Sequence, residues 1–136
     1  MPAVLLDTCA IIFIAEDQPI DPSARREVMA ATAGDGVLVS PVSAWEIGLL
    51  ATPRGFVFLP DPRAWFNSFL ANAGVQLSPL TPDIAIASSF LAPPLHSDPA
   101  DRLLIATARA LAVPILTRDH RILAYAQAGL VGAIPC

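Results

Sequence analysis

Four acidic residues stand where carboxylates could act together on a phosphate group. Asp7 and Asp119 each follow a short aliphatic run, whereas Glu46 and Asp101 fall in the early turns of helical stretches. If the aliphatic runs are parallel strands, their carboxyl ends meet at one edge of a sheet, which is where ligands gather in such folds. We therefore expect the four acids to face one another.

A cluster of this kind predicts a particular chemistry. Neighbouring carboxylates cannot all ionise at neutral pH unless a cation offsets their repulsion. Mg²⁺ and Mn²⁺ prefer carboxylate oxygens and keep several waters that a substrate can replace. Such ions can activate a water and stabilise the leaving oxygen of an in-line displacement at phosphorus. Asp7, Glu46, Asp101 and Asp119 thus indicate a Mg²⁺ or Mn²⁺ site with nuclease or phosphatase chemistry.

Asp7 and Glu46 also have structural interpretations. Asp7 could cap a helix that begins near Thr8, although an idle charge beside a buried strand would be costly. Glu46 lies three residues after Ser43, the spacing of a capping box. Ser40-Pro41 is nevertheless the better helix start, which places Glu46 in the second turn. We favour a functional role for both acids.

The remaining acids have structural alternatives too. Asp98 precedes Pro99 and is expected to be a helix N-cap rather than a metal ligand. Asp101 would then be the third residue of that helix, where the helix dipole alone favours an acid. Asp119 could cap the last helix. The presence of the other acids favours a metal-binding role for Asp101 and Asp119.

Several polar residues stand beside these acids. Thr8 and Thr117 could orient a carboxylate or a metal-bound water, or could be ordinary turn residues. His96 and His120 have no accompanying nucleophile motif, so we expect solvated loop histidines. Three arginines could hold phosphates, form salt bridges or face solvent: Arg102, Arg118 and Arg121.

Short aliphatic runs predict the strands that carry the acids. They are 4–6, 37–39, 75–77, 115–117 and a weaker run from Val131 to Ile134. These runs are continuous rather than alternating, so we expect strands buried on both faces. Strands alternating with helices predict an α/β fold, with a central, mainly parallel sheet sandwiched by helices.

A polar residue followed by proline predicts the helix starts, because it combines an N-cap with the residue best suited to the first helical position. It occurs at Asp21-Pro22, Ser40-Pro41, Asp61-Pro62, Thr81-Pro82 and Asp98-Pro99. The predicted helix ends are Gly34, Gly74 and Gly129. The segment from Ala51 to Pro60 is predicted to be a mobile loop or a hairpin.

The composition fits one domain over residues 1–136. The chain is 54% hydrophobic and 15% charged, which allows a large core and little surface for a second domain. No apolar run reaches the roughly 18 residues of a membrane span and no basic signal region is present, so we expect a cytoplasmic protein. Cys9 and Cys136 lack the close partners of a zinc site. Cys9 is expected to pack internally and Cys136 to lie at a frayed terminus.

The charge of the chain limits how it could contact nucleic acid. The net charge is −4 and the isoelectric point about 4.8, which is the wrong sign for binding through a broad basic surface. Any contact with nucleic acid must therefore be local. All eight basic residues are arginines.

Together these features resemble PIN-domain ribonucleases, and specifically the VapC-type toxins of bacterial toxin-antitoxin pairs. The resemblance extends over nearly the whole chain in the order of that family. It rests on Leu5-Leu6-Asp7-Thr8, on Val39-Ser40 through Trp45-Glu46-Ile47, on the segment from His96 to Ala106 with its Asp98-Pro99-Ala100-Asp101-Arg102, and on Leu116-Thr117-Arg118-Asp119.

The resemblance implies a set of functional properties. Asp7, Glu46, Asp101 and Asp119 match the acidic quartet of the family, with Mg²⁺ or Mn²⁺ as cofactor and RNA as substrate. It further implies a homodimer silenced by a cognate antitoxin, which lays an amphipathic segment in an apolar groove and directs a basic side chain toward the acids. The candidates for that groove are Ile11, Phe13, Trp45 and Leu49, which could instead be core residues.

Three alternatives compete with this interpretation. A phosphate-receiver domain and a haloacid-dehalogenase-like phosphatase would each need a lysine in the active site, and the chain has no lysine. The phosphatase also needs an acid two residues after Asp7, where Cys9 stands. The third alternative is a PIN-like module that binds RNA or protein without turnover. Metal-dependent RNA cleavage that Asp101→Asn abolishes would distinguish the enzyme from this module.

Overall fold

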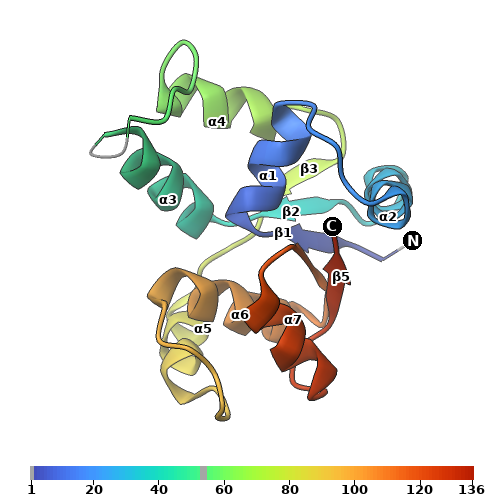
Figure 1. The fold of residues 1–136 in the computed structure, drawn as a ribbon, viewed down its shortest axis with the longest axis vertical. Helices are drawn as coiled ribbons and strands as arrows, with labels where there is room; N and C mark the ends of the chain where they lie inside the picture. The colour runs from blue at the N-terminus through green and yellow to red at the C-terminus, as the bar shows by residue number, and fades with distance from the viewer. Residues whose placement is uncertain (1, 53–54) are drawn as a thin grey trace.

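The computed structural model describes residues 2–52 and 55–136, and over these residues the chain forms one five-stranded sheet whose pairings are all parallel (Figure 1). The strands lie in the order β3-β2-β1-β4-β5. Their bounds are β1 Val4–Leu6, β2 Val37–Val39, β3 Val75–Leu77, β4 Ile115–Thr117 and β5 Ala133–Pro135. The predicted parallel sheet is confirmed, and Asp7 and Asp119 follow its central strand, β1, and the adjacent inner strand, β4.

Four of the five strands were predicted with the observed bounds. The fifth was expected from Val131 to Ile134 and lies two residues later at its start. Burial on both faces holds for β1 and β4, and nearly for β2. For β3 and β5 the prediction is wrong, because these are edge strands that are half-buried or exposed.

The predicted helix starts are all confirmed. The helices are α1 Thr8–Ala15, α2 Pro22–Ala33, α3 Pro41–Ala51, α4 Pro62–Leu70, α5 Pro82–Ala87, α6 Pro99–Leu111 and α7 His120–Gln127, with a 3₁₀ turn η1 at Ser88–Phe90. Each helix that begins with proline has the expected residue before it, whose side chain accepts a hydrogen bond from a backbone N–H of the first turn. Proline at the first position loses no hydrogen bond, since that N–H has no partner within the helix.

Two of the three predicted helix ends are confirmed. Gly34 is the C-cap of α2, and Gly129 follows α7 with a φ of 80°. The Gly129 N–H donates to the Ala126 carbonyl at 2.9 Å and the Leu130 N–H donates to the Tyr125 carbonyl at 3.3 Å, the paired arrangement that closes many helices. Gly74 does not end a helix, because α4 already ends at Leu70. It lies in the turn before β3, where a Cβ would approach the Thr32 carbonyl oxygen to 2.6 Å.

Helices cover both faces of the sheet, as the predicted fold class requires. Figure 1 shows α1 to α4 gathered on one side and α5 to α7 on the other. Val4 and Leu6 pack with α1, α2 and α4, whereas Leu5 and Ile115 pack with α6 and α7. Alternate residues of each central strand therefore bury into separate cores, which holds the carboxyl ends of β1 and β4 rigidly between two helical layers.

The segment from Ala51 to Pro60 is only partly described, because residues 53 and 54 lie outside the described residues. From 55 to 60 it forms no strand, so the hairpin alternative is wrong for that part. Phe58 is buried and packs edge-on against Trp65 with ring centroids 4.9 Å apart. The far end of the segment is thereby anchored to α4.

Both cysteines differ from expectation. Cys9 is exposed on the first turn of α1 instead of packing in the core, because that face of the helix borders the acidic edge of the sheet. Cys136 is not frayed, since its N–H bonds to the Thr117 carbonyl and its own carbonyl accepts from Arg118. Among the described residues, no helix is long and apolar enough to cross a membrane.

Candidate functional site

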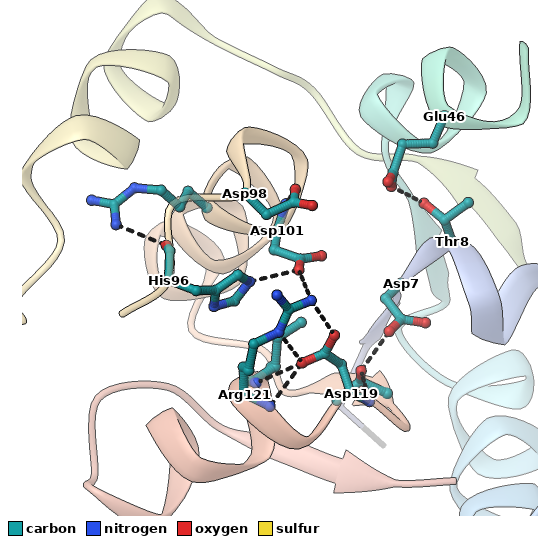
Figure 2. Close-up of polar contacts among 11 residues, drawn as sticks. Asp7, Thr8, Glu46, His96, Asp98, Asp101, Asp119 and Arg121 are labelled. Atoms are coloured by element: carbon teal, nitrogen blue, oxygen red, sulfur yellow. Dashed lines mark hydrogen bonds and ion pairs between the residues drawn. The ribbon is translucent and has the colours of Figure 1, made fainter. Parts of the chain in front are cut away.

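The fold brings the four predicted acids into one hollow. Asp7 leaves β1 as the N-cap of α1, and Asp119 stands two residues beyond β4 as the N-cap of α7. Glu46 lies in the second turn of α3 and Asp101 in the first turn of α6. The hollow, of about 260 Å³, is lined by Asp7, Thr8, Cys9, Phe13, Glu46, Asp101, Arg118 and Asp119. Figure 2 shows the four carboxylates arranged around its centre.

Asp7 is the most deeply placed of the four acids, with 6% of its surface exposed. Its Oδ1 accepts the Ala10 N–H at 2.8 Å, so it does cap α1, and its Oδ2 accepts a hydrogen bond from Thr117. The pKa of Asp7 is raised to about 6: burial raises it most, the hydrogen bonds from Thr117 and Ala10 lower it in part, and the charges of Asp101 and Asp119 also raise it. Asp7 therefore has a structural role in addition to its place in the acidic cluster.

Glu46 is not part of a capping box, because the side chain of Ser40 caps α3. Its Oε1 accepts a hydrogen bond from Thr8, whose hydroxyl lies 2.9 Å from that of Ser43. Burial raises the pKa of Glu46, and the Thr8 hydrogen bond lowers it only in part. The suggestion that Thr8 and Thr117 orient carboxylates is thus confirmed for Glu46 and Asp7.

Asp101 is held by a histidine that the sequence did not assign to the site. Nε2 of His96 lies 2.7 Å from Asp101 Oδ2, and the two side chains are only 13% and 16% exposed. The expectation of a solvated His96 is wrong, although His120 is exposed as expected. Burial raises the pKa of Asp101 and the bond from His96 lowers it. Asp98 caps α6 through the Asp101 N–H at 3.1 Å, as predicted.

The spacing of His96 contains the signal that would have found it. The residue lies two positions before the N-cap Asp98, so the chain that enters α6 must turn back across the first helical turn, where Asp101 stands. His96 Nδ1 is buried and, in the part of the chain that the structure describes, has no hydrogen-bond partner. Nε2 is therefore the ring nitrogen through which His96 contacts Asp101.

Asp119 differs electrostatically from the other three acids. It accepts hydrogen bonds from the Arg121 N–H at 2.8 Å and the Ile122 N–H at 3.2 Å, which confirms the helix cap considered from the sequence. Its Oδ2 also lies 3.1 Å from Arg121 Nη2. Burial acts to raise the pKa of Asp119, but these hydrogen bonds and the charge of Arg121 outweigh it and lower the pKa.

The three arginines near the acids have different environments. Arg102 donates to two backbone carbonyls, one of them that of His96, and Arg118 donates to the Cys136 carbonyl at 2.8 Å. These two side chains tie loops together. Arg121 forms ion pairs with acids of the site while remaining 58% exposed. Of the three arginines, Arg121 is the one that forms ion pairs with the acids, whereas Arg118 is also exposed and lines the acidic hollow.

The donor chemistry of the site fits Mg²⁺ or Mn²⁺. Buried carboxylates that raise one another's pKa are the ligands that a hard divalent cation would stabilise in the ionised form. Within residues 2–52 and 55–136, however, no three acidic, histidine or cysteine side chains already converge as a ligand set. Because these ions keep several waters, a site in which some carboxylates act through water suits them.

A second hollow of about 350 Å³ adjoins the acids. Trp45 and Leu49 of α3 line it with 51% and 46% of their surfaces exposed, and Glu46 connects it to the acidic hollow. Its other lining residues are Thr8, Cys9, Leu50, Asp98, Pro99 and Ala100. Two of the predicted groove residues therefore lie in a groove. Ile11 does not, because it is fully buried in the core below α1, and Phe13 lines the acidic hollow instead.

Structure and site together define a three-layer α/β protein with an acidic hollow at the carboxyl ends of its central strands. Residues 4–128, which are most of the chain, match the PIN domain. The chain therefore belongs to the PIN-domain family.

Individual relatives agree with this assignment. Ribonuclease VapC22 of Mycobacterium tuberculosis is 28% identical over 123 residues, which cover 90% of this chain and 91% of the relative. VapBC2 from Rickettsia felis, solved bound to a DNA fragment from its promoter, matches with a TM-score of 0.68 at 10% identity over 98% of both chains. VapBC-5 of M. tuberculosis, a member of the VapBC family of toxin-antitoxin systems, matches with a TM-score of 0.62 at 20% identity over 98% of both chains. At these identities the two structures establish the fold.

Proposed function

We propose that this protein is an endoribonuclease that depends on Mg²⁺ or Mn²⁺ and acts as the toxin of a toxin-antitoxin pair. The observation that carries the proposal is the meeting of four acids from four separate segments in one hollow. Three of them, Asp7, Glu46 and Asp101, have raised pKa values because they are buried close to other carboxylates. Such an arrangement opposes folding unless a cation offsets it, so it points to a function.

Each residue of the site has a separate task in this proposal. Asp7, Glu46, Asp101 and Asp119 would hold the ion, some of them through water, since Mg²⁺ and Mn²⁺ keep several waters. When bound, the ion would supply activation of a water and stabilisation of the leaving oxygen. Three of the carboxylates are oriented in advance by hydrogen bonds. Thr117 bonds to Asp7, Thr8 to Glu46 and His96 to Asp101.

RNA is the substrate that the relatives favour, since the curated relative is called a ribonuclease. The net charge of −4 and the pairing of Arg102 and Arg118 with carbonyls leave little positive surface for a long polyanion. Recognition should therefore depend on a few local contacts and on RNA shape.

Cleavage of a total RNA pool by the purified protein tests the proposed activity. We expect RNA fragments with Mn²⁺ or Mg²⁺ and none with EDTA, because the ion that the carboxylates hold would supply the activation of the attacking water. Absence of cleavage under every condition, together with no detectable Mn²⁺ binding, would instead favour the module that binds RNA or protein without turnover.

The partner of this enzyme is proposed to be a cognate antitoxin. Several similar structures are toxin-antitoxin complexes, including those from R. felis and M. tuberculosis. The groove beside Glu46 exposes Trp45 and Leu49 and opens toward the acids. An amphipathic helix laid on these two side chains would place its next residues at the acidic hollow, where a basic side chain would find uncompensated carboxylates.

Trp45→Ala should therefore weaken neutralisation by the cognate antitoxin while leaving RNA cleavage nearly unchanged. A central tryptophan of an interface contributes about 2 kcal/mol or more, so the antitoxin concentration for half-inhibition should rise roughly 30-fold. The measurement is RNA cleavage against increasing antitoxin. Met29→Ala, which removes another exposed apolar side chain, this one on α2, is the matched control. Equal inhibition of both variants and the wild type would contradict this docking site.

Two further predictions accompany the proposal. The homodimer implied by the family resemblance stays a prediction, which sedimentation of the purified protein would test. Residence in the cytoplasm also stays a prediction, which fractionation of cells that produce the protein would test.

A further inference from the structure

Arg121 occupies an unusual place for a side chain of an acidic site. Its Nη2 lies 3.1 Å from Asp119 Oδ2 and 3.7 Å from Asp101 Oδ2, so one guanidinium bridges two acids that come from different helices. Among the described residues, it is the arginine that forms ion pairs with the acidic cluster. Figure 2 shows the guanidinium reaching from α7 to a position between these two carboxylates.

The surroundings of Arg121 allow it to leave. Its side chain is 58% exposed, whereas Asp101 and Asp119 are 16% and 26% exposed. It also lines a neighbouring hollow of about 350 Å³ with Leu95 and Tyr125, so it borders free space outside the acidic hollow. An exposed ion pair of this kind contributes little stability and can exchange readily.

We propose that Arg121 is a built-in counter-ion, which holds Asp101 and Asp119 together in the metal-free protein and is displaced when a divalent cation binds. The guanidinium and the cation seek the same two carboxylates, and the two positive charges repel each other. Binding of the ion must therefore break the Arg121 pairs. The inference rests on the proposed metal dependence and adds that this chain carries its own competitor for the metal.

A structural role for Arg121 would predict the opposite effect of its removal. If the guanidinium only held the acids in place for the ion, losing it would disorder the site and weaken metal binding. If it competes with the ion, losing it must strengthen metal binding. The direction of the change in metal affinity therefore separates the two roles without any measurement of catalysis.

The test is Mn²⁺ binding, followed by the electron paramagnetic resonance signal of free Mn²⁺, for wild type, Arg121→Gln and Arg121→Lys. We expect Arg121→Gln to bind Mn²⁺ about 3- to 10-fold more tightly than wild type. The variant has no exposed ion pair to break and no guanidinium to repel the cation. Arg121→Lys keeps the charge and should bind nearly as weakly as wild type. Raising the salt concentration should shrink the difference, because the pairs are exposed.

Arg25→Gln is the matched control, because it removes the same charge from an exposed position on α2, which contributes no residue to the acidic hollow. Its Mn²⁺ affinity should equal that of wild type. Equal affinity of wild type and Arg121→Gln, or weaker binding by Arg121→Gln, would overturn the exchange while leaving the proposed metal dependence intact. No Mn²⁺ binding by any of the four proteins would overturn both.

Discussion

Asp101→Asn is expected to lower the rate of metal-dependent RNA cleavage by at least about 100-fold. Loss of an outer partner of a metal ligand typically costs 10- to 100-fold, so loss of a ligand's own charge should cost more. The substitution keeps the size of the side chain and the backbone N–H that bonds to Asp98, so α6 should still begin at Pro99. The measurement is the single-turnover rate on an RNA substrate at saturating Mn²⁺.

Asp98→Asn provides a matched control for this prediction. Asn caps helices about as well as Asp, so the control keeps α6 and removes one negative charge within a turn of Asp101. We expect it to retain most of the wild-type rate. If both variants lost activity equally, the general charge of the region and not the Asp101 carboxylate would be responsible. A wild-type rate for Asp101→Asn would remove Asp101 from the proposed catalytic residues.

Local sequence signals were sufficient for the elements that carry the acids. A residue such as Ser40 or Asp61 before a proline defines a helix start through contacts within one turn, so no knowledge of the rest of the fold is needed. The aliphatic runs at β1 and β4 are equally local, because strands buried on both faces must be apolar throughout. Together they placed Asp7 and Asp119 at one edge of the sheet.

Contacts between distant segments could not be predicted in the same way. The orientation of Glu46 depends on Thr8, which lies 38 positions away, and that of Asp7 on Thr117, which lies 110 positions away. Hydroxyls beside acids suggested such pairs, but spacing alone could not decide between an orienting role and a turn. Only the register of β1 with β4 brings Thr117 to Asp7.

The errors also have a common cause. His96 was expected to face solvent, and β3 and β5 were expected to be buried on both faces. The burial of each depends on which element packs beside it and not on its neighbours in the sequence. Edge strands with aliphatic residues look like central ones, since both satisfy the same local preference. Ile11 shows the converse, because an apolar residue near the site was a candidate for the groove and proved to be core.

Asp7→Asn should have an effect opposite to that of most substitutions of buried residues, because it should stabilise the metal-free protein. The pKa of Asp7 is raised from 3.8 to about 6 by burial, so ionising it at pH 7.5 costs the folded state up to about 3 kcal/mol relative to the unfolded state. Asn removes this cost and can still accept the Ala10 N–H as an N-cap. Urea unfolding in EDTA measures the gain, and RNA cleavage by the variant should be lost.

The pH dependence of this gain identifies its cause. Below the unfolded pKa of Asp7 both states are protonated, and the stabilising contribution of the protonated folded carboxyl is fully present. That contribution is lost as the pH rises through the folded pKa of about 6, so the advantage of Asp7→Asn over wild type should grow between pH 4 and 6 and then level off.

Asp21→Asn makes the same change at the exposed N-cap of α2 and should show little such trend. An advantage independent of pH would mean that altered packing, and not the buried charge, sets the stability at Asp7. A pH-dependent gain that Mn²⁺ abolishes by stabilising the wild type alone would tie the destabilising carboxylate directly to the ion that it is proposed to hold.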